Sequence, residues 1–230
     1  MKKLFMISAA AVILSATPAT AATNLLVNGS FENGLSGWTL GGVIGAPPMA
    51  EPPVVTPYNS LAGYPNGAHG EPIPVPGATG NPGYDAVGSN ALYFVADGPG
   101  PQTLQQSVST VAGLYTVGFD FYLPLNGFNN QGNAVLTAIV NGSPIASFVA
   151  STQSPQVWDH FSTTMLLPTA ANVTFMFSYG ASTFPAKDFV IDRAYFVAVP
   201  EPTTWAMMLG GFGLLGAAAR RRPSTKVACA

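Results

Sequence analysis

The sequence predicts an all-β protein, an antiparallel β-sandwich with an N-terminal signal helix before it and a short C-terminal hydrophobic helix after it. Two observations predict the sandwich. Between the two end segments the chain alternates apolar and polar residues in short runs and shows no helical periodicity. Turn residues separate these runs at regular spacing, which is typical of sandwiches and barrels.

The predicted strands are clearest where alternate residues are apolar. This period of two marks residues 114–123 and residues 173–179. Asn141 and Gly142 separate two further runs and predict a tight hairpin, because both turn positions require positive φ. The other expected strands are 53–56, 91–95, 104–108, 134–140, 145–150, 157–164 and 189–197, and residues 24–40 are expected to form a strand, a turn and a second short strand.

The composition of residues 23–198 limits the domain organisation and the partners that can be expected. Residues 23–198 are one domain of ordinary size, long enough to bury a core. Its only basic residues are Lys187 and Arg193 against nine acidic ones, a net charge of −7. No nucleic-acid partner is expected for so acidic a domain. The single cysteine, Cys229, lies outside the domain, so packing rather than a disulfide is expected to stabilise it.

A long insertion interrupts the predicted strands. Residues 41–90 contain ten prolines and ten glycines, far above ordinary usage. We expect an irregular loop with a short strand at 53–56. A loop of this length within a compact domain is expected to be functional or mobile.

The first residues predict export. Lys2 and Lys3 precede an apolar run from Leu4 to Leu14, and Ala19 to Ala21 form a small-x-small cleavage pattern. Residues 1–22 are therefore expected to be a signal peptide, with cleavage after Ala21 or Ala22. The Sec translocon and signal peptidase are the implied partners.

The C-terminal segment, residues 199–223, predicts membrane retention; residues 224–230 are a short tail. Its apolar part, Trp205 to Ala219, is fifteen residues or roughly 22 Å of helix, against ~30 Å of hydrocarbon. The arginines after it favour a cytoplasmic end, and a permanent tail anchor is the alternative. The residues that define the segment are Pro200, Glu201, Pro202, Trp205, Ala206, Arg220, Arg221 and Arg222.

This segment, "VPEPTTWAMMLGGFGLLGAAARRR", resembles the PEP-CTERM sorting signal in its variant with Trp-Ala after Pro-Glu-Pro. The resemblance implies that an exosortase cuts near that motif. It also implies an inner-membrane precursor that is then released or transferred at the surface of Gram-negative, exopolysaccharide-producing bacteria.

The domain has a resemblance of its own. "NLLVNGSFENGLSGW", "LQQSVSTVAGLYTVGFDFYL" and "DFVIDRAYFVAV" are similar to strands of carbohydrate-binding modules with the galactose-binding-domain-like jelly-roll fold. The resemblance implies a structural Ca²⁺ between the N-terminal turn and the last strand, where Glu32 and Asp192 match. Carboxylate oxygens suit that ion. The alternative is that Glu32 caps a turn and Asp192 faces a sheet edge.

Sugar binding requires exposed aromatic rings beside polar groups. Trp38 and Trp158 are more simply interpreted as core residues, whereas the loop tyrosines are expected to be exposed. The candidates are Trp38, Tyr58, Tyr64, Tyr84 and Trp158.

The sequence does not predict a catalytic site. His69 and His160 stand alone, and neither zinc spacing nor a nucleophile elbow occurs. Asp188 and Asp192 would lie about 13 Å apart on one strand, too far for a hydrolase pair. We expect a non-enzymatic, carbohydrate-binding surface or matrix protein associated with exopolysaccharide; a structural or adhesion protein without a sugar site is the alternative, and a glycosidase the third.

Overall fold

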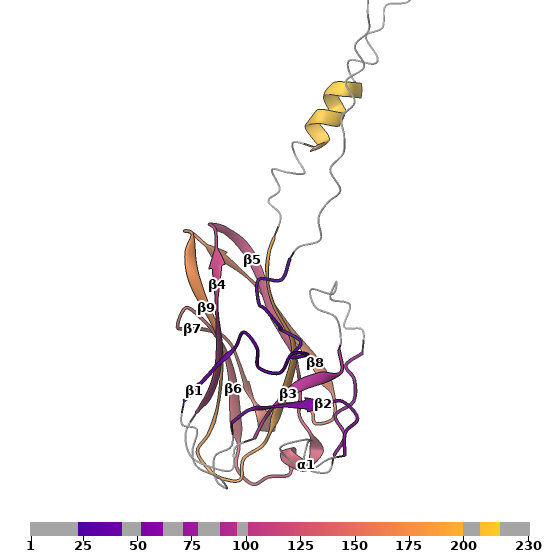
Figure 1. The fold of residues 1–230 in the computed structure, drawn as a ribbon, viewed down its shortest axis with the longest axis vertical. Helices are drawn as coiled ribbons and strands as arrows, with labels where there is room; N and C mark the ends of the chain where they lie inside the picture. The colour runs from indigo at the N-terminus through magenta and orange to yellow at the C-terminus, as the bar shows by residue number, and fades with distance from the viewer. Residues whose placement is uncertain are drawn as a thin grey trace, which may run out of the picture.

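The chain folds into two antiparallel sheets packed face to face, as predicted (Figure 1). The computed structural model describes residues 23–42, 52–61, 71–77, 88–95, 101–199 and 208–216. Within them, one five-stranded sheet has the order β1-β4-β9-β6-β7 and the other the order β2-β3-β10-β5-β8. We name them by their edge strands, the β1/β7 sheet and the β2/β8 sheet.

The elements follow the predicted runs closely. In chain order they are β1 Thr39–Gly42, β2 Val54–Pro57, β3 Asn90–Phe94, β4 Gln102–Thr110, β5 Gly113–Tyr122, α1 Leu125–Phe128, β6 Ala134–Val140, β7 Ser143–Val149, a 3-10 turn Ala150–Thr152, β8 Trp158–Leu167, β9 Ala171–Ala181 and β10 Phe189–Ala198. The predicted hairpin between β6 and β7 is confirmed, since Asn141 and Gly142 have φ values of 48° and 76°.

The core lies where the two predicted apolar faces meet. On β5 the residues from Tyr115 to Phe121 alternate between the core and the outer face, and β9 does the same from Val173 to Tyr179. Phe119 of β5 packs edge-to-face on Phe177 of β9, with ring centroids 4.9 Å apart. Period two therefore identified the buried side of both sheets correctly.

The predicted N-terminal strand does not form. Asn24 makes only an isolated bridge to Val197, and a series of turns follows. Asn28 adopts a φ of 55°, and its side chain bonds to the backbone of Asn33 and Gly34. This local bonding replaces a sheet ladder, because asparagine tolerates left-handed backbone and closes turns with its own amide. Only the second predicted strand appears, as β1.

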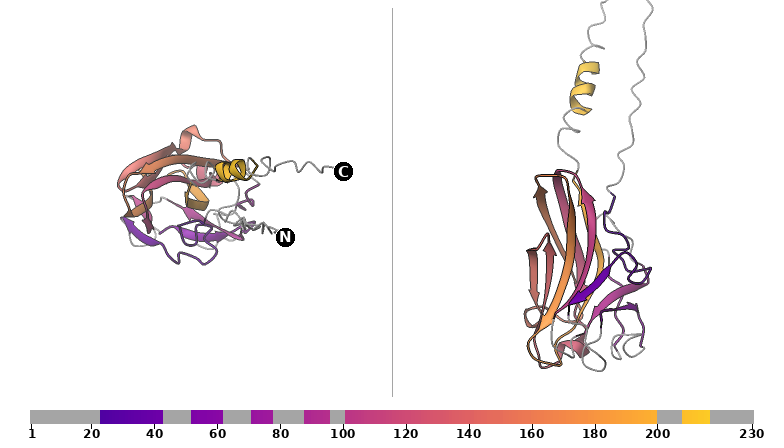
Figure 2. Two further views of the ribbon diagram at one scale, coloured as in Figure 1. Left: turned by 90° about the horizontal axis from the view of Figure 1, so that it is seen from above. Right: turned by 60° about the vertical axis from the view of Figure 1, so that its left-hand side comes forward.

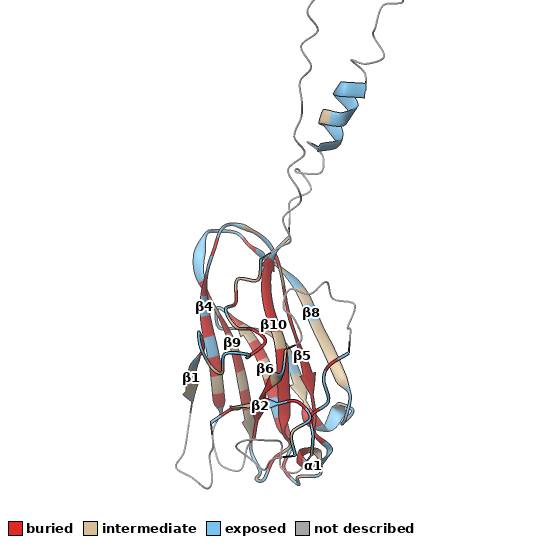
Figure 3. Ribbon diagram, turned by 45° about the vertical axis from the view of Figure 1, so that its right-hand side comes forward, coloured by how far each residue is buried: buried red, intermediate tan, exposed pale blue. Residues whose placement is uncertain are grey.

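Part of the Pro/Gly-rich insertion covers the outer face of the β2/β8 sheet. All residues from Ala91 to Val95 are buried, on both faces of the strand. The neighbouring central strands β10 and β5 are also largely buried (Figure 3). Tyr58 and Ile73 of the insertion pack on that outer face. The residues of this second cluster are Tyr58, Ile73, Ala91, Tyr93, Val95, Tyr122 and Val190.

The two ends of the sandwich domain lie together, away from α1 (Figures 1 and 2). Leu25 N–H donates to Phe196 O at 2.8 Å, and Val199 N–H donates to Leu114 O at 2.8 Å. Residues 208–216 are helical, within the predicted hydrophobic helix. Among the described residues, no helix is both long enough and apolar enough to cross a bilayer. The predicted signal helix, residues 1–22, lies outside the described residues.

Candidate functional site

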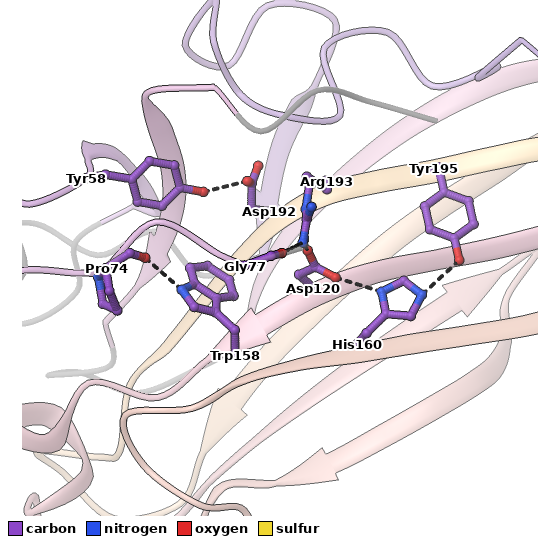
Figure 4. A network of polar contacts seen from close by, with 9 residues as sticks. All are labelled: Tyr58, Pro74, Gly77, Asp120, Trp158, His160, Asp192, Arg193 and Tyr195. Atoms are coloured by element: carbon purple, nitrogen blue, oxygen red, sulfur yellow. Dashed lines mark hydrogen bonds and ion pairs between the residues drawn. The ribbon is translucent and has the colours of Figure 1, made fainter. Parts of the chain in front are cut away.

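Polar and aromatic side chains gather on the covered face of the β2/β8 sheet (Figure 4). The register pairs Asp192 with Asp120 and Asp120 with His160, so three titratable groups form one row across β10, β5 and β8. On β5 the core residues are odd-numbered, and Asp120 therefore points to the other face.

Asp120 is the centre of this row. It is buried, and its carboxylate faces His160 Nδ1 at 2.6 Å and also accepts from the Arg193 guanidinium. A bulge in β10 at Arg193, where φ is 49°, places that side chain on the same face as Asp192. The buried carboxyl group of Asp120 thus has two side-chain partners, as a buried polar group requires.

The network extends from Asp120 in two directions. On one side, Tyr195 Oη lies 3.2 Å from His160 Nε2 and donates to Ser162 Oγ at 2.8 Å. On the other, Arg193 donates to Gly77 O of the insertion at 3.3 Å. The network therefore joins the sheet to the segment that covers it.

Asp192 forms the second link between sheet and insertion. The Tyr58 hydroxyl donates to Asp192 Oδ2 at 2.5 Å. Burial raises the pKa of Asp192 well above its usual range, although the Tyr58 hydrogen bond acts in the opposite direction. Burial, together with the Asp192 charge, also raises the pKa of Tyr58. Asp192 Oδ1 is buried and has no hydrogen-bond partner among the described residues.

The predicted exposure of Tyr58 is wrong. Its side chain is 9% exposed, because β2 pairs with β3 and carries Tyr58 directly onto the sheet. Trp38 is a core residue, as the simpler interpretation held. Its indole packs between Phe31 and Phe177 and donates to Asn28 O at 3.0 Å. Tyr64, Tyr84 and His69 lie outside the described residues.

Trp158, in contrast, is only half-buried, at the start of edge strand β8. Its ring lies 5.3 Å from that of Tyr122 and 6.2 Å from that of Tyr58, and its Nε1–H donates to Pro74 O at 2.7 Å. The structure thus brings together two of the predicted sugar-binding residues, Tyr58 and Trp158.

A carboxylate and two amide-bearing residues lie beside these rings. Glu71 accepts from Gln156 Nε2 at 2.9 Å and from the Asn126 backbone N–H at 2.7 Å. Burial, followed by Glu71, raises the pKa of Tyr122 to about 12. We call Trp158, Tyr122, Glu71, Gln156 and Asn126 the Trp158 edge. An aromatic face beside a few polar groups is the combination that lines small-molecule binding sites.

The predicted calcium ligands are engaged separately. Glu32 Oε1 accepts from Ser89 N at 2.8 Å and Asn90 N at 2.9 Å, and so clamps the N-terminal turn to β3. No group of three or more Asp, Glu, His or Cys side chains gathers as a metal site in the described part of the chain. The orphaned Asp192 Oδ1 is the feature that suits a hard cation. The ion stays a prediction.

The carboxylates considered for hydrolysis are inaccessible. Asp188 is 2% exposed and accepts from Tyr93 at 2.5 Å, and Asp192 is fully buried under Tyr58. In this arrangement neither carboxylate can reach a substrate in solvent.

Neither the Asp120–Arg193 pair nor the contacts of Glu71 were predicted from the sequence. One signal was available. The run Ala91 to Val95 is uniformly apolar rather than alternating, which indicates a strand buried on both faces. The outer face of such a strand must pack against another segment, and the insertion that precedes it in sequence is the segment that does so.

Two sequence comparisons bear on the chain. Residues 198–222 match the PEP-CTERM protein-sorting motif, which confirms the resemblance of the C-terminal segment and indicates an exported protein. No curated protein sequence matches the chain.

Similar solved structures are β-sandwiches, mainly carbohydrate-binding modules. TmCBM61 in complex with β-1,4-galactotriose is 20% identical, with a TM-score of 0.48 and coverage of 77% of this chain and 99% of that one. Family 16 Carbohydrate Binding Module-2 is 15% identical (TM-score 0.43; 76% and 99%). The enzymatically active domain of bacteriophage CBA120 tailspike protein 4 is 14% identical (TM-score 0.45; 76% and 21%). At these identities none of them assigns a ligand to this chain.

Proposed function

We propose that this chain is an exported cell-surface or matrix protein whose sandwich domain is a non-catalytic module that binds exopolysaccharide. The sorting motif supports the export, with exosortase as processing partner and a transient inner-membrane precursor. The Trp158 edge carries the sugar-binding part of the proposal.

The Trp158 edge has the chemistry that a sugar requires. Trp158 offers a partly exposed indole, held in place by Tyr122 on one side and by its bond to Pro74. Because these contacts exist before a ligand arrives, little side-chain freedom is lost on binding. Glu71 and Gln156 lie alongside with oxygen and nitrogen atoms that can bond to sugar hydroxyls.

The expected affinity of one site is low. A ring stacked on a sugar face contributes about 1 kcal/mol, by analogy with other aromatic contacts. One ring thus supplies only part of the roughly 4 kcal/mol that a millimolar site requires, so a single site is expected to bind no more tightly than the millimolar to high-micromolar range. Many copies at a surface can still hold a polymer through multivalency.

Retention on the producing organism's own exopolysaccharide tests the proposal. We expect Trp158→Ala to lose most of the retention of the exported form, and Gln156→Ala to lose part of it. Val157→Ala is the matched control, because Val157 adjoins the site in sequence and is 47% exposed. Thermal melting of each variant separates lost binding from lost folding.

Two outcomes would change the conclusion. Equal retention of Trp158→Ala and the parent would exclude the Trp158 edge as the site. In that case Tyr64→Ala and Tyr84→Ala test the other predicted aromatic residues, in the part of the insertion that the structure does not describe. If the parent is not retained at all, the structural-matrix alternative replaces sugar binding.

A further inference from the structure

Two connections lie side by side at the end of the sandwich from which the C-terminal segment departs. The β4–β5 connection passes from the β1/β7 sheet to the β2/β8 sheet, and the β8–β9 connection passes back. Thr110 pairs with Ala171 and Gly113 pairs with Leu167, so the two connections are neighbours on both sides. Together they form one end surface of the domain.

Large apolar side chains project from this surface. Val111 is 68% exposed, Leu114 is 41% exposed and Leu166 is 67% exposed. Leu114 and Leu166 are cross-strand partners on β5 and β8. We call these three residues the apolar tip. Exposed apolar residues are ordinary when scattered, but three at one end of a domain, two of them cross-strand partners, need a reason.

The apolar tip is also free of charge. Residues 109–116 and 163–174, which build this end, contain no Asp, Glu, Lys or Arg, although the domain as a whole has a net charge of −7. An anionic lipid surface repels acidic protein surface and accepts an uncharged, apolar one. This end is therefore suited to contact a bilayer.

The tip is tied to the C-terminal segment. Val199 N–H donates to Leu114 O at 2.8 Å, so the chain leaves the domain beside the tip. Eight residues separate Val199 from Met208, the first described residue of the C-terminal helix. Even fully extended, they span only roughly 30 Å. A C-terminal segment held in a membrane would keep the tip close to the lipid surface.

We infer that the apolar tip contacts the phospholipid surface in the uncleaved precursor. Val111, Leu114 and Leu166 enter the headgroup region, while the acidic remainder of the domain stays in water. The contact ends when the C-terminal segment is cut, because three side chains alone are a weak membrane anchor. The inference rests on the proposed membrane-retained precursor, and the experiment distinguishes the two.

Spin labels on the full chain test the contact. The chain carries Cys229→Ser and one new cysteine, and is reconstituted into phosphatidylethanolamine–phosphatidylglycerol vesicles. A label at Leu166→Cys reports on the tip, Gln105→Cys on an exposed position of β4 away from it, and Gly210→Cys on the C-terminal helix. Accessibility to O₂ relative to a water-soluble nickel chelate is measured for each.

We expect a severalfold higher ratio at positions 166 and 210 than at position 105. A high ratio at 210 with a water-like ratio at 166 would overturn the inference and leave the membrane-retained precursor intact. Water-like ratios at both positions would overturn both. A high ratio at 166 that persists without vesicles would indicate contact with a second copy instead, and would also overturn the inference.

A charged variant supplies a second readout. Val111→Asp combined with Leu114→Asp should lower the ratio at position 166 to that at position 105, with an unchanged ratio at position 210. Both substituted side chains are exposed, so thermal melting should change little. An unaltered ratio at 166 in this variant would contradict a contact made by the apolar tip.

Discussion

The Tyr58 hydroxyl donates a 2.5 Å hydrogen bond to the carboxylate of Asp192, and so attaches the Pro/Gly-rich insertion to a central strand of the β2/β8 sheet. The two residues are 134 positions apart. Both residues are buried, so the hydrogen bond is shielded from solvent. A buried polar group that loses its hydrogen-bond partner destabilises the folded state.

Removing the Tyr58 hydroxyl should therefore weaken the attachment of the insertion to the β2/β8 sheet. In Tyr58→Phe the Asp192 carboxylate loses its side-chain donor, and we expect a loss of about 1–3 kcal/mol in the free energy of unfolding. Urea denaturation measures the loss, and limited proteolysis should cut the insertion faster than in the parent. A double-mutant cycle with Asp192→Asn is the control; additive effects of the two substitutions would contradict a direct coupling.

Asp192 should also make stability depend on pH. Because burial raises its pKa, the native state retains a proton that the unfolded chain has already released. The free energy of unfolding should then fall as pH rises from the ordinary carboxyl value of about 4 towards the raised one. Asp192→Asn removes the titrating group, so its stability relative to the parent should increase across that window.

Urea unfolding between pH 4 and pH 8, with a chelator present, measures this difference. The chelator matters because a bound cation would keep Asp192 ionised. If the curves of the parent and Asp192→Asn run parallel with pH, Asp192 does not titrate in that range.

Calcium should raise the melting temperature if Glu32 and Asp192 share an ion. A ligand that binds only the native state stabilises it by mass action. Millimolar Ca²⁺ should then stabilise the parent, and Glu32→Gln should abolish the effect, whereas Glu71→Gln should retain it. Identical melting curves with and without chelator would exclude a Ca²⁺ ion shared by Glu32 and Asp192.

Processing should remove both ends of the chain. The intact mass of the exported protein should correspond to a start near Ala22 or Thr23 and an end near Pro200 to Pro202. Neutral replacements of the three C-terminal arginines should weaken inner-membrane retention and leave the fold unchanged. An exported product that still carries Arg220 to Arg222 would refute the cleavage.

The local alternation of apolar and polar residues predicted the sandwich. It did not predict that the insertion covers the outer face of the β2/β8 sheet. Alternation on β5 and β9 located the core because each strand has one face against the other sheet. The Asn141-Gly142 turn was predictable because two adjacent residues determine it.

The Asp120–Arg193 and Tyr58–Asp192 contacts join residues 73 and 134 positions apart, and no local period encodes such pairs. The exposed interpretation of Tyr58 failed for the same reason. A proline-rich setting is typical of surface loops, but here tertiary contacts place the tyrosine on a sheet. Trp158 was more simply interpreted as a core residue but is half-buried, because an edge strand gives a side chain both a packed side and an open one.

The strand order has a consequence for when the domain can fold. β9 lies between β4 and β6, and β10 lies between β3 and β5, so the last two strands to emerge occupy interior positions in the two sheets. A chain that emerges N-terminus first cannot complete the β1/β7 sheet before residue 181 or the β2/β8 sheet before residue 198. Until then β4 and β6, and β3 and β5, each keep an unpaired edge. Closure of the sandwich therefore coincides with arrival of the sorting segment, which starts one residue later. A chain that stops before Phe189 should remain unfolded and prone to aggregation.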